Sequence, residues 1–283
     1  MIKILQGNCL EVLKDLPEQS VNTCITSPPY WQLRDYQEKE QLGLEDTPEE
    51  FVENLVNVFR EVKRVLRDDG TVWLNLGDSY VGGGGGNYNK TGISQAGGQH
   101  ITNVKNRKDF IKKSGLKPKD LVGIPWRVAF GLQKDRWFLR QDIIWHKPVT
   151  MPESVTDRCT KSHEYIFLLS KKAKYYFDNE AIKEDSKTST VKRNKRSVWS
   201  VNTKPFKGAH FATFPPDLIR PCVLAGCPEG GTVLDPFGGA GTTGLVAEQN
   251  NRDSILIELN ADYIEIAKER LNNDAPLFNE VIT

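Results

Sequence analysis

Short apolar runs alternate with segments of helical periodicity along most of the chain. The apolar runs predict strands over Ile2–Leu5, Val21–Thr26, Thr71–Leu76, Asp142–Trp145, Tyr165–Leu169, Thr232–Asp235 and Ser254–Glu258. The periodic segments predict helices over Leu10–Leu16, Thr47–Leu66, Leu121–Leu132, Pro216–Ala225, Thr242–Glu248 and Ala261–Leu271. Strands that alternate with helices in this way predict an α/β fold with a mainly parallel sheet and helices on both faces. We expect a single domain over residues 1–283.

The strongest helix start in the sequence lies at Thr47. Pro48 occupies the first helical position and Glu50 stands three residues after the cap, as in a capping box. After this helix, Asp68-Asp69-Gly70 predicts a turn before the next strand.

Charge is unevenly distributed, although the net charge is only +1. Residues 82–119 contain eight Lys or Arg and one acid, and residues 171–207 contain eleven and four, so each segment carries +7 and the remainder carries −13. An acidic body with two basic segments is expected of a protein that binds nucleic acid through a local surface. We therefore expect two basic insertions, a glycine-rich one at 80–119 and a candidate target-recognition region at 179–207. The candidate DNA-contacting residues are Lys105, Arg107, Lys108, Lys192, Arg193, Lys195 and Arg196.

A glycine-rich segment follows the strand that ends at Asp235. Gly239, Gly241 and Gly244 have the Gly-x-Gly-x-x-Gly spacing of a nucleotide-binding turn, where the backbone approaches a ligand closely. Glu258 ends the next strand, where an acid reaches a ribose diol. Asp235 would repel a pyrophosphate but suits a cofactor with an amino group or a positive sulfonium. S-adenosylmethionine has both and no phosphate, so we expect it as the cofactor.

A second candidate site, Ser27-Pro28-Pro29-Tyr30, directly follows the strand Val21–Thr26. The carboxyl ends of strands in such sheets form the ligand-binding edge. The Ser27 hydroxyl and the Pro28 carbonyl can accept hydrogen bonds from one amino group, and the Tyr30 ring offers a face on which a base stacks. These residues predict a pocket for a planar ring with an exocyclic amine.

The two motifs together resemble those of the DNA amino-methyltransferases, in the order of the family's beta group. The resemblance extends over almost the whole chain, and it includes Asn75–Asp78, Trp145–Pro148 and Ala212–Pro215. It implies a circularly permuted, Rossmann-like sheet of an S-adenosylmethionine-dependent methyltransferase, with basic insertions for DNA recognition.

The resemblance also implies how the residues of the site divide. The residues expected to be catalytic are Ser27, Pro28, Pro29 and Tyr30. The residues expected to bind the cofactor are Asn8, Thr26, Phe214, Pro215, Asp235, Phe237, Gly239, Gly241, Thr242 and Glu258. Asn8 stands where the family often has an Asp that reaches the adenine amine, and its side-chain oxygen can accept the same hydrogen bond.

The implied activity is transfer of a methyl group from S-adenosylmethionine to the exocyclic N4 amine of cytosine in double-stranded DNA. The base is flipped out of the duplex and the transfer is direct, so no metal is expected. Within the family, Ser-Pro-Pro-Tyr is more often associated with cytosine N4 and Asp-Pro-Pro-Tyr with adenine N6, so an N6-adenine enzyme is the alternative. The expected setting is cytoplasmic, in a prokaryote or encoded by a phage. The sequence leaves open two partners, a cognate restriction endonuclease acting on the same site and a second copy of the chain in a homodimer.

Other interpretations explain less of the sequence. A catalytically silent DNA-binding module predicts the loss of one motif, and a dinucleotide oxidoreductase does not account for Ser27–Tyr30. Pro221-Cys222 matches the Pro-Cys nucleophile of cytosine-C5 methyltransferases but lacks the accompanying Glu-Asn-Val. Cys222, Cys227 and His210 lack a fourth ligand for zinc, so we expect both cysteines in the core.

Overall fold

The computed structural model describes residues 1–36, 38–81, 99–100, 114–150, 152–186, 190–203, 213–274 and 281–282 of the chain. The helices within these ranges are α1 Cys9–Asp15, α2 Pro48–Val65, α4 Ile124–Lys134, the 3-10 helix η1 Glu180–Ile182, α5 Pro216–Gly226, α6 Thr242–Glu248 and α7 Ala261–Asp274. The strands are β1 Ile2–Gln6, β2 Val21–Thr26, β3 Arg34–Asp35, β4 Leu66–Leu76, β5 Gln99–His100, β6 Phe138–His146, β7 His163–Ser170, β8 Val198–Ser200, β9 Thr232–Asp235, β10 Asp253–Glu258 and β11 Val281–Ile282.

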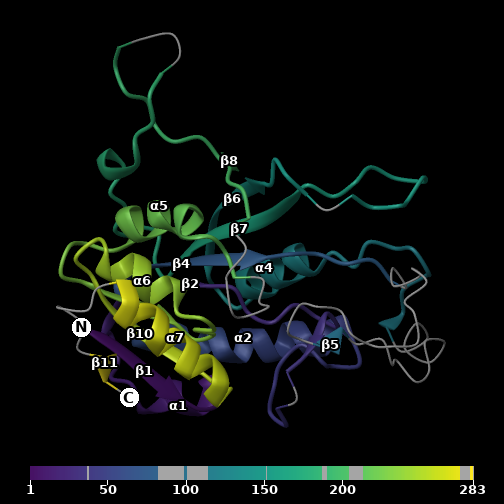
Figure 1. Cartoon of the computed structure of the whole chain (residues 1–283), viewed down its shortest axis with the longest axis horizontal. Coiled ribbons are helices and arrows are strands. Elements are labelled where there is room, and N and C mark those ends of the chain that lie inside the picture. Colours follow the sequence, from purple (N-terminus) through teal and green to yellow (C-terminus); the bar gives the residue numbers. More distant parts are fainter. Residues whose placement is uncertain are drawn as a thin grey trace.

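Within the described part of the chain, nine strands form one sheet in the order β11-β1-β10-β9-β2-β4-β7-β6-β8. Strand β7 is antiparallel to β4 and β6, and every other neighbouring pair in this sheet is parallel. Strand β1 lies beside β10, so the beginning of the chain joins the half of the sheet built by its last quarter (Figure 1). This arrangement is the Rossmann-like α/β sheet with the permuted order that the motifs implied.

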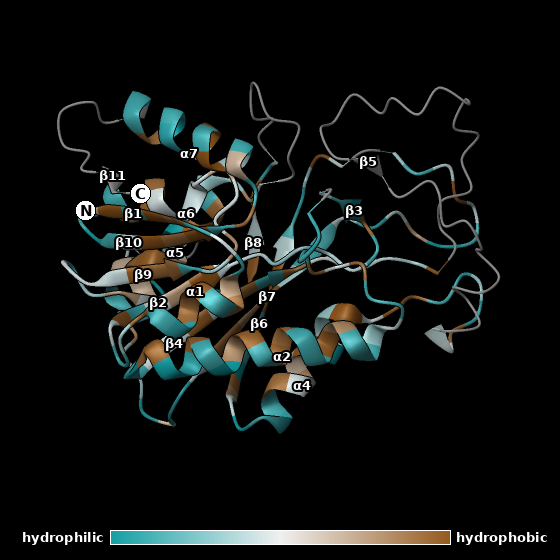
Figure 2. Ribbon diagram, turned by 90° about the horizontal axis from the view of Figure 1, so that it is seen from below, coloured by the Kyte–Doolittle hydropathy of each residue, from teal (hydrophilic) through white to brown (hydrophobic). Residues whose placement is uncertain are grey.

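Helices cover both faces of the sheet because its strands are apolar on both sides. Figure 1 shows α2 and α5 on opposite sides of β2 and β4. Helices α1, α2 and α4 pack into one apolar cluster, and α5 packs over the other face together with Trp73 and Trp145. Helix α7 covers β1 and β10, and Figure 2 shows it mostly hydrophilic beside strands coloured as hydrophobic. The sheet therefore forms the centre of the core and leaves its carboxyl edge for a site.

Helix α2 begins as its sequence predicts. The Thr47 hydroxyl accepts a hydrogen bond from the Glu50 backbone N–H at 3.1 Å, and the Glu50 carboxylate accepts one from the Thr47 N–H at 3.2 Å. A cap of this kind stabilises a helix by about 1 kcal/mol. Phe51, Leu55 and Val62 then lie fully buried on the face that packs against the sheet.

Three expectations for local structure were wrong. Asp68–Gly70 does not separate two elements, because it belongs to β4, whose pairing with β2 shifts register between Val21 and Thr23. The helix expected from Leu121 begins at Ile124, because Gly123 caps it in the left-handed conformation at φ +78°. The basic segment 179–207, in which no strand was predicted, contains β8, where buried Trp199 alternates with two exposed neighbours.

Candidate active site

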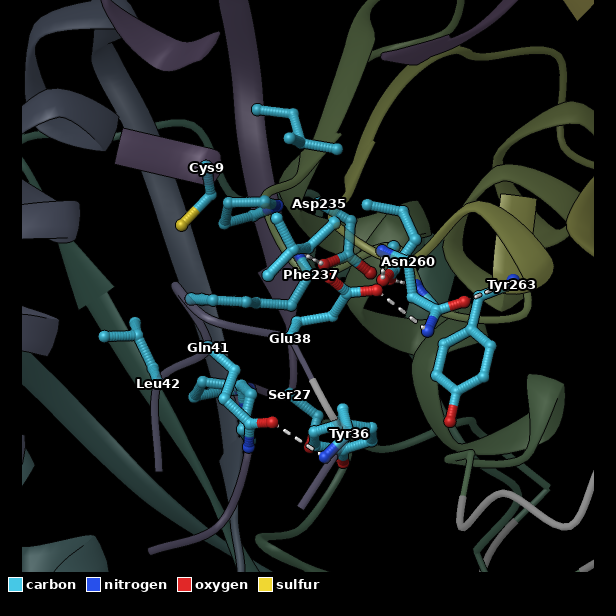
Figure 3. Close-up of a pocket in the computed structure, with 18 of the residues that line it drawn as sticks. Cys9, Ser27, Tyr36, Glu38, Gln41, Leu42, Asp235, Phe237, Asn260 and Tyr263 are labelled. Carbon is cyan, nitrogen blue, oxygen red and sulfur yellow. Dashed lines mark hydrogen bonds between the residues drawn. The ribbon is translucent and has the colours of Figure 1, made fainter. Parts of the chain in front are cut away.

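A cavity of about 340 Å³ lies where β1, β2, β9 and β10 end (Figure 3). Its volume falls within the range of small-molecule sites, which is roughly 300–1,000 Å³. The two motifs, more than 200 residues apart in the chain, meet in this one cavity. Residues named from the sequence that line it are Asn8, Ser27, Pro28, Pro29, Tyr30, Phe214, Asp235, Phe237, Gly239, Thr242 and Glu258.

Asp235 is held by three hydrogen bonds at the base of the cavity. Its carboxylate accepts from the Thr26 and Thr243 hydroxyls, each at 2.6 Å, and from the Phe237 backbone N–H at 3.0 Å. Only 1% of the residue is exposed. Burial raises the pKa of Asp235 to about 6, against the opposing effect of these hydrogen bonds. Thr26, which does not line the cavity, therefore contributes by orienting Asp235.

The glycine turn is bound to Glu258. The Glu258 carboxylate accepts hydrogen bonds from the backbone N–H groups of Gly239 at 2.8 Å and Asn260 at 2.9 Å, and burial raises its pKa. Gly241 adopts φ +74°, and a Cβ there would lie 3.1 Å from the Cβ of Ala267 on α7. Gly241 therefore allows the turn and the close approach of α7, and it does not line the cavity. Pro215 also lies outside the lining, directly before α5.

Residues that the sequence did not single out form another wall of the cavity, and they are Tyr36, Glu38, Glu40, Gln41 and Leu42 (Figure 3). The Glu38 carboxylate accepts a hydrogen bond from the Asn260 amide at 3.3 Å, and Glu40 accepts one from the Asn8 amide at 3.1 Å. The Asn8 side-chain oxygen caps α1, where it accepts from the Leu10 N–H at 2.9 Å. These contacts join distant segments, so no local motif predicts them.

The lining suits a cationic cofactor better than a phosphorylated one. Among the described residues, its charged side chains are the four carboxylates of Glu38, Glu40, Asp235 and Glu258 and the single guanidinium of Arg34. Aromatic and aliphatic side chains complete the walls, among them Phe214 and Phe237. A pyrophosphate would be repelled by this lining, whereas a sulfonium with an adenosine ring fits it.

Tyr30 lies between the cavity and a charged cluster behind it. Its hydroxyl donates a hydrogen bond to the Glu164 carboxylate at 2.6 Å, and Lys147 donates to the other oxygen of the same carboxylate. Burial and the neighbouring Glu164 charge raise the pKa of Tyr30 well above its usual value. A Cβ at Gly77 would lie 2.4 Å from the Tyr30 ring, so the ring rests directly on that backbone.

Several of the candidate DNA-contacting side chains form ion pairs or ring contacts within the protein. Arg193 and Arg196 both pair with Glu184, at 3.0 and 2.9 Å, because an antiparallel bridge brings Glu184 beside Arg193. One carboxylate shared by two arginines leaves the run from Lys192 to Arg196 with a net positive charge. Lys195 lies over the Trp199 ring, 5.0 Å from its centroid, and Lys192 is exposed. Lys105, Arg107 and Lys108 lie outside the described residues.

Three further features of the described residues concern metal binding, the cysteine thiols and membrane-spanning helices. Within them, no three His, Cys, Asp or Glu side chains gather as metal ligands do, and His210 is not among the described residues. Cys222 and Cys227 are buried in the core, and burial raises the pKa of the Cys222 thiol. In the same ranges, each helix is too short or too polar to span a lipid bilayer.

Comparison with known proteins places these features in one family. A family model described as DNA methylase, for N6 and N4 methyltransferases, matches residues 21–269. The Type II methyltransferase M.Cfr9I of Citrobacter freundii is 52% identical over 96% of this chain and 88% of its own length. M.SmaI of Serratia marcescens is 49% identical over 95% and 90%.

Solved structures agree with this assignment. A putative DNA modification methylase from Thermus thermophilus, solved as a complex with S-adenosyl-L-methionine, has a TM-score of 0.65 at 25% identity and full coverage of both chains. The cytosine-N4-specific PvuII DNA methyltransferase shares the fold, with a TM-score of 0.69 at 20% identity over 99% of this chain and 93% of its own. The chain therefore belongs to the DNA methylase family of N4 and N6 amino-methyltransferases, and it is an S-adenosylmethionine-dependent DNA methyltransferase.

Proposed function

We propose that the protein methylates the exocyclic N4 amine of cytosine in double-stranded DNA. The observation that carries the proposal is the single cavity that joins Ser27–Tyr30 to the turn Asp235–Thr242. One wall then holds the methyl donor and the neighbouring wall holds the acceptor base. Because the two walls share one cavity, the methyl group passes directly from donor to acceptor.

The cofactor half of the site is the part built on β9, β10 and β1. Asp235 and Glu258 supply negative charge, Glu258 lies where the ribose diol is expected, and Phe214 and Phe237 provide apolar walls. Bound S-adenosylmethionine supplies an activated methyl group on a positive sulfonium, which is a good leaving group. Gly241 and Thr26 support this half without lining it.

The base half of the site is Ser27-Pro28-Pro29-Tyr30. We propose that the target base is flipped out of the duplex and stacks on Tyr30. The lone pair of an exocyclic amine is delocalised into the ring, so the amine is a poor nucleophile. Acceptors at the Ser27 hydroxyl and the Pro28 carbonyl favour the pyramidal form of the amine, which resembles the transition state. Pro29 fixes the backbone directly after the Pro28 carbonyl.

The choice of cytosine rests on the Ser at position 27, since the family more often pairs Ser-Pro-Pro-Tyr with N4 of cytosine. N6-adenine methylation remains the alternative. The basic segments 80–119 and 179–207 are proposed as the DNA-recognition insertions of one domain.

We further propose a restriction-modification setting in the cytoplasm, which the Type II relatives support. A cognate endonuclease needs no direct contact with this chain, because both enzymes act on the same DNA sequence. A homodimer is the other partner considered, and sedimentation of the purified protein decides between monomer and dimer.

The test is mass analysis of nucleosides from unmethylated genomic DNA treated with the purified protein and S-adenosylmethionine. We expect N4-methyldeoxycytidine to accumulate with time. N6-methyldeoxyadenosine instead would favour the alternative, and the absence of both would overturn the proposed function. Sequencing of the modified DNA then identifies the recognition sequence.

A further inference from the structure

The Tyr30 side chain is fixed at both its face and its hydroxyl. Its ring rests on the backbone at Gly77, where even a Cβ would approach within 2.4 Å of the ring. Its hydroxyl donates to Glu164 at 2.6 Å, a short distance typical of a bond to an ionised carboxylate. The ring therefore cannot tilt toward β4, and it cannot turn away from Glu164 without breaking a charge-assisted hydrogen bond.

Two further residues, Lys147 and Asn75, hold the Glu164 carboxylate in turn. Lys147, directly after β6, donates to one carboxylate oxygen, and Asn75 on β4 lies 3.4 Å from the other. The Asn75 amide also donates to the Tyr165 carbonyl at 3.0 Å, which fixes Asn75 in turn. The side chains of Glu164 and Lys147 are only 14% and 19% exposed. An ion pair this well enclosed holds the Glu164 carboxylate in place.

The direction of β7 makes this cluster possible. Because β7 is antiparallel to β4 and β6, its first residues lie at the same edge of the sheet as the ends of β2, β4 and β6. Glu164, the second residue of β7, is therefore brought behind Tyr30, although 134 residues separate them in the sequence. Glu164 does not line the cavity, so it can act on a bound base only through Tyr30.

We propose that Glu164 is a positioning residue for methyl transfer, which holds the Tyr30 ring in the orientation that receives the flipped base. The inference rests on the proposed stacking role of Tyr30. A hydrogen bond to an ionised group contributes enough to change a rate by roughly 10- to 100-fold when it is lost. The loss is expected in the chemical step, because a tilted ring misplaces the amine relative to the methyl group.

The test compares three variants, Tyr30→Phe, Glu164→Gln and the double variant. Single-turnover methyl transfer is measured with tritiated S-adenosylmethionine on saturating, enzymatically amplified bacterial genomic DNA, which carries no methylation. Each single variant is expected to lower the rate at least about tenfold, in line with the lost bond. The double variant is expected to be no slower than the slower single variant, because both changes remove the same interaction. The dissociation constant of S-adenosylmethionine is expected to stay at its wild-type value.

Glu61→Gln is the matched control. Glu61 pairs with Arg64 at 2.8 Å and its side chain is 25% exposed, so the same isosteric change breaks a comparable ion pair outside the cavity. We expect its transfer rate to match the wild type.

Wild-type rates in Tyr30→Phe or Glu164→Gln would overturn the inference, and so would single effects that multiply in the double variant. Tyr30→Phe deletes the bond without changing charge, so it decides the matter even if Glu164→Gln does not fold. Tyr30→Ala separates this inference from the proposed function. A normal rate in Tyr30→Ala would reject base stacking, whereas a slow Tyr30→Ala beside a normal Glu164→Gln would reject only the role of Glu164.

Discussion

Burial and hydrogen bonding act on Asp235 in opposite directions. Burial wins and raises its pKa from 3.8 to about 6, although two hydroxyls and one backbone N–H donate to its oxygens. Relative to the unfolded chain, the folded protein without cofactor therefore favours the protonated acid, although at pH 7 the carboxylate is still mostly ionised. The stability that this preference contributes is present below about pH 4 and is lost as the pH rises through about 6.

The affinity for S-adenosylmethionine should show the opposite pH dependence. A sulfonium in the cavity favours the ionised carboxylate, so we expect the affinity to rise about tenfold or more between pH 5 and 7 and to level off above. Calorimetric titration across this range measures it. Asp235→Asn should flatten the dependence, and an unchanged slope in that variant would assign the effect to another acid. Glu258→Gln is the necessary comparison, because burial also raises the pKa of Glu258 in the same cavity.

Substitution of Ser27 or Tyr30 should slow methyl transfer to the base without weakening the binding of the cofactor. We expect Ser27→Ala and Tyr30→Ala to bind S-adenosylmethionine normally, because their proposed partners are the amine and ring of the base. Loss of one hydrogen bond or one stacked ring should slow labelled-methyl incorporation into DNA by about tenfold or more. A near-normal rate in Tyr30→Ala would remove its stacking role, and weakened cofactor binding in Ser27→Ala would place that hydroxyl in the wrong half of the site.

The sequence predicted those site residues that lie within a local motif. Ser27–Tyr30, Asp235 and Glu258 each end or follow a strand, and that position alone points to the ligand-binding edge. Glu38 and Glu164 were missed, because their contacts depend on which strands become neighbours in the sheet. The sharing of Glu184 by Arg193 and Arg196 depends likewise on the antiparallel bridge that the folded chain forms at Glu184 and Arg193.

At the scale of elements, several strands and helices have the bounds that the sequence predicted. Strands β2 and β9 and helix α6 coincide with the predicted ranges. The turn expected at Asp68–Gly70 was wrong because a strand irregularity depends on its partner's register, which a single sequence does not encode locally. Strand β8 was missed because only three residues of a basic segment alternate in burial.

The basic segment that precedes β8 should contribute to DNA affinity mainly through its unpaired charges. Lys192 is exposed, whereas Arg193 is balanced by Glu184. If Lys192 contacts a phosphate, Lys192→Gln should reduce the slope of log affinity against log salt by about 0.9. We expect Arg193→Gln to reduce it less. Fluorescence anisotropy with duplex DNA over a salt series measures both slopes.

Two outcomes would contradict this prediction. An unchanged slope in Lys192→Gln would mean that Lys192 faces solvent in the complex. Equal reductions in both variants would mean that the pair between Arg193 and Glu184 opens when DNA binds. Cofactor affinity should remain at the wild-type value in both, because neither residue lines the cavity.

At the scale of the whole molecule, the cofactor should stabilise segments that are far apart in the sequence. The cavity is lined by the turn after β9, by the end of β10 and by residues 38–42, where Glu40 and Glu38 are hydrogen-bonded to Asn8 and Asn260. Ligand at 100 times its dissociation constant stabilises the bound state by about 2.7 kcal/mol, which slows exchange through coupled openings up to about 100-fold.

Hydrogen exchange with and without S-adenosylmethionine checks this. We expect slower exchange in residues 38–42 as well as in 235–241 and 258–263, with β6 and β8 as internal controls that do not line the cavity. Protection confined to the glycine turn would show that residues 38–42 do not enclose the cofactor.

The pairing of β2 with β9 has a consequence for how such enzymes diversify. The two strands pair through Thr23 with Val233 and Cys24 with Leu234, and one ends before Ser27 while the other ends at Asp235. A slip of one residue would displace the strands by about 3.3 Å and turn their side chains to the wrong faces. That displacement is as large as the separation of about 3–3.5 Å at which reacting atoms meet. In the proposed site, the register of this one strand pair therefore sets the distance between methyl donor and acceptor, and we expect DNA specificity to vary in segments that leave this register unchanged.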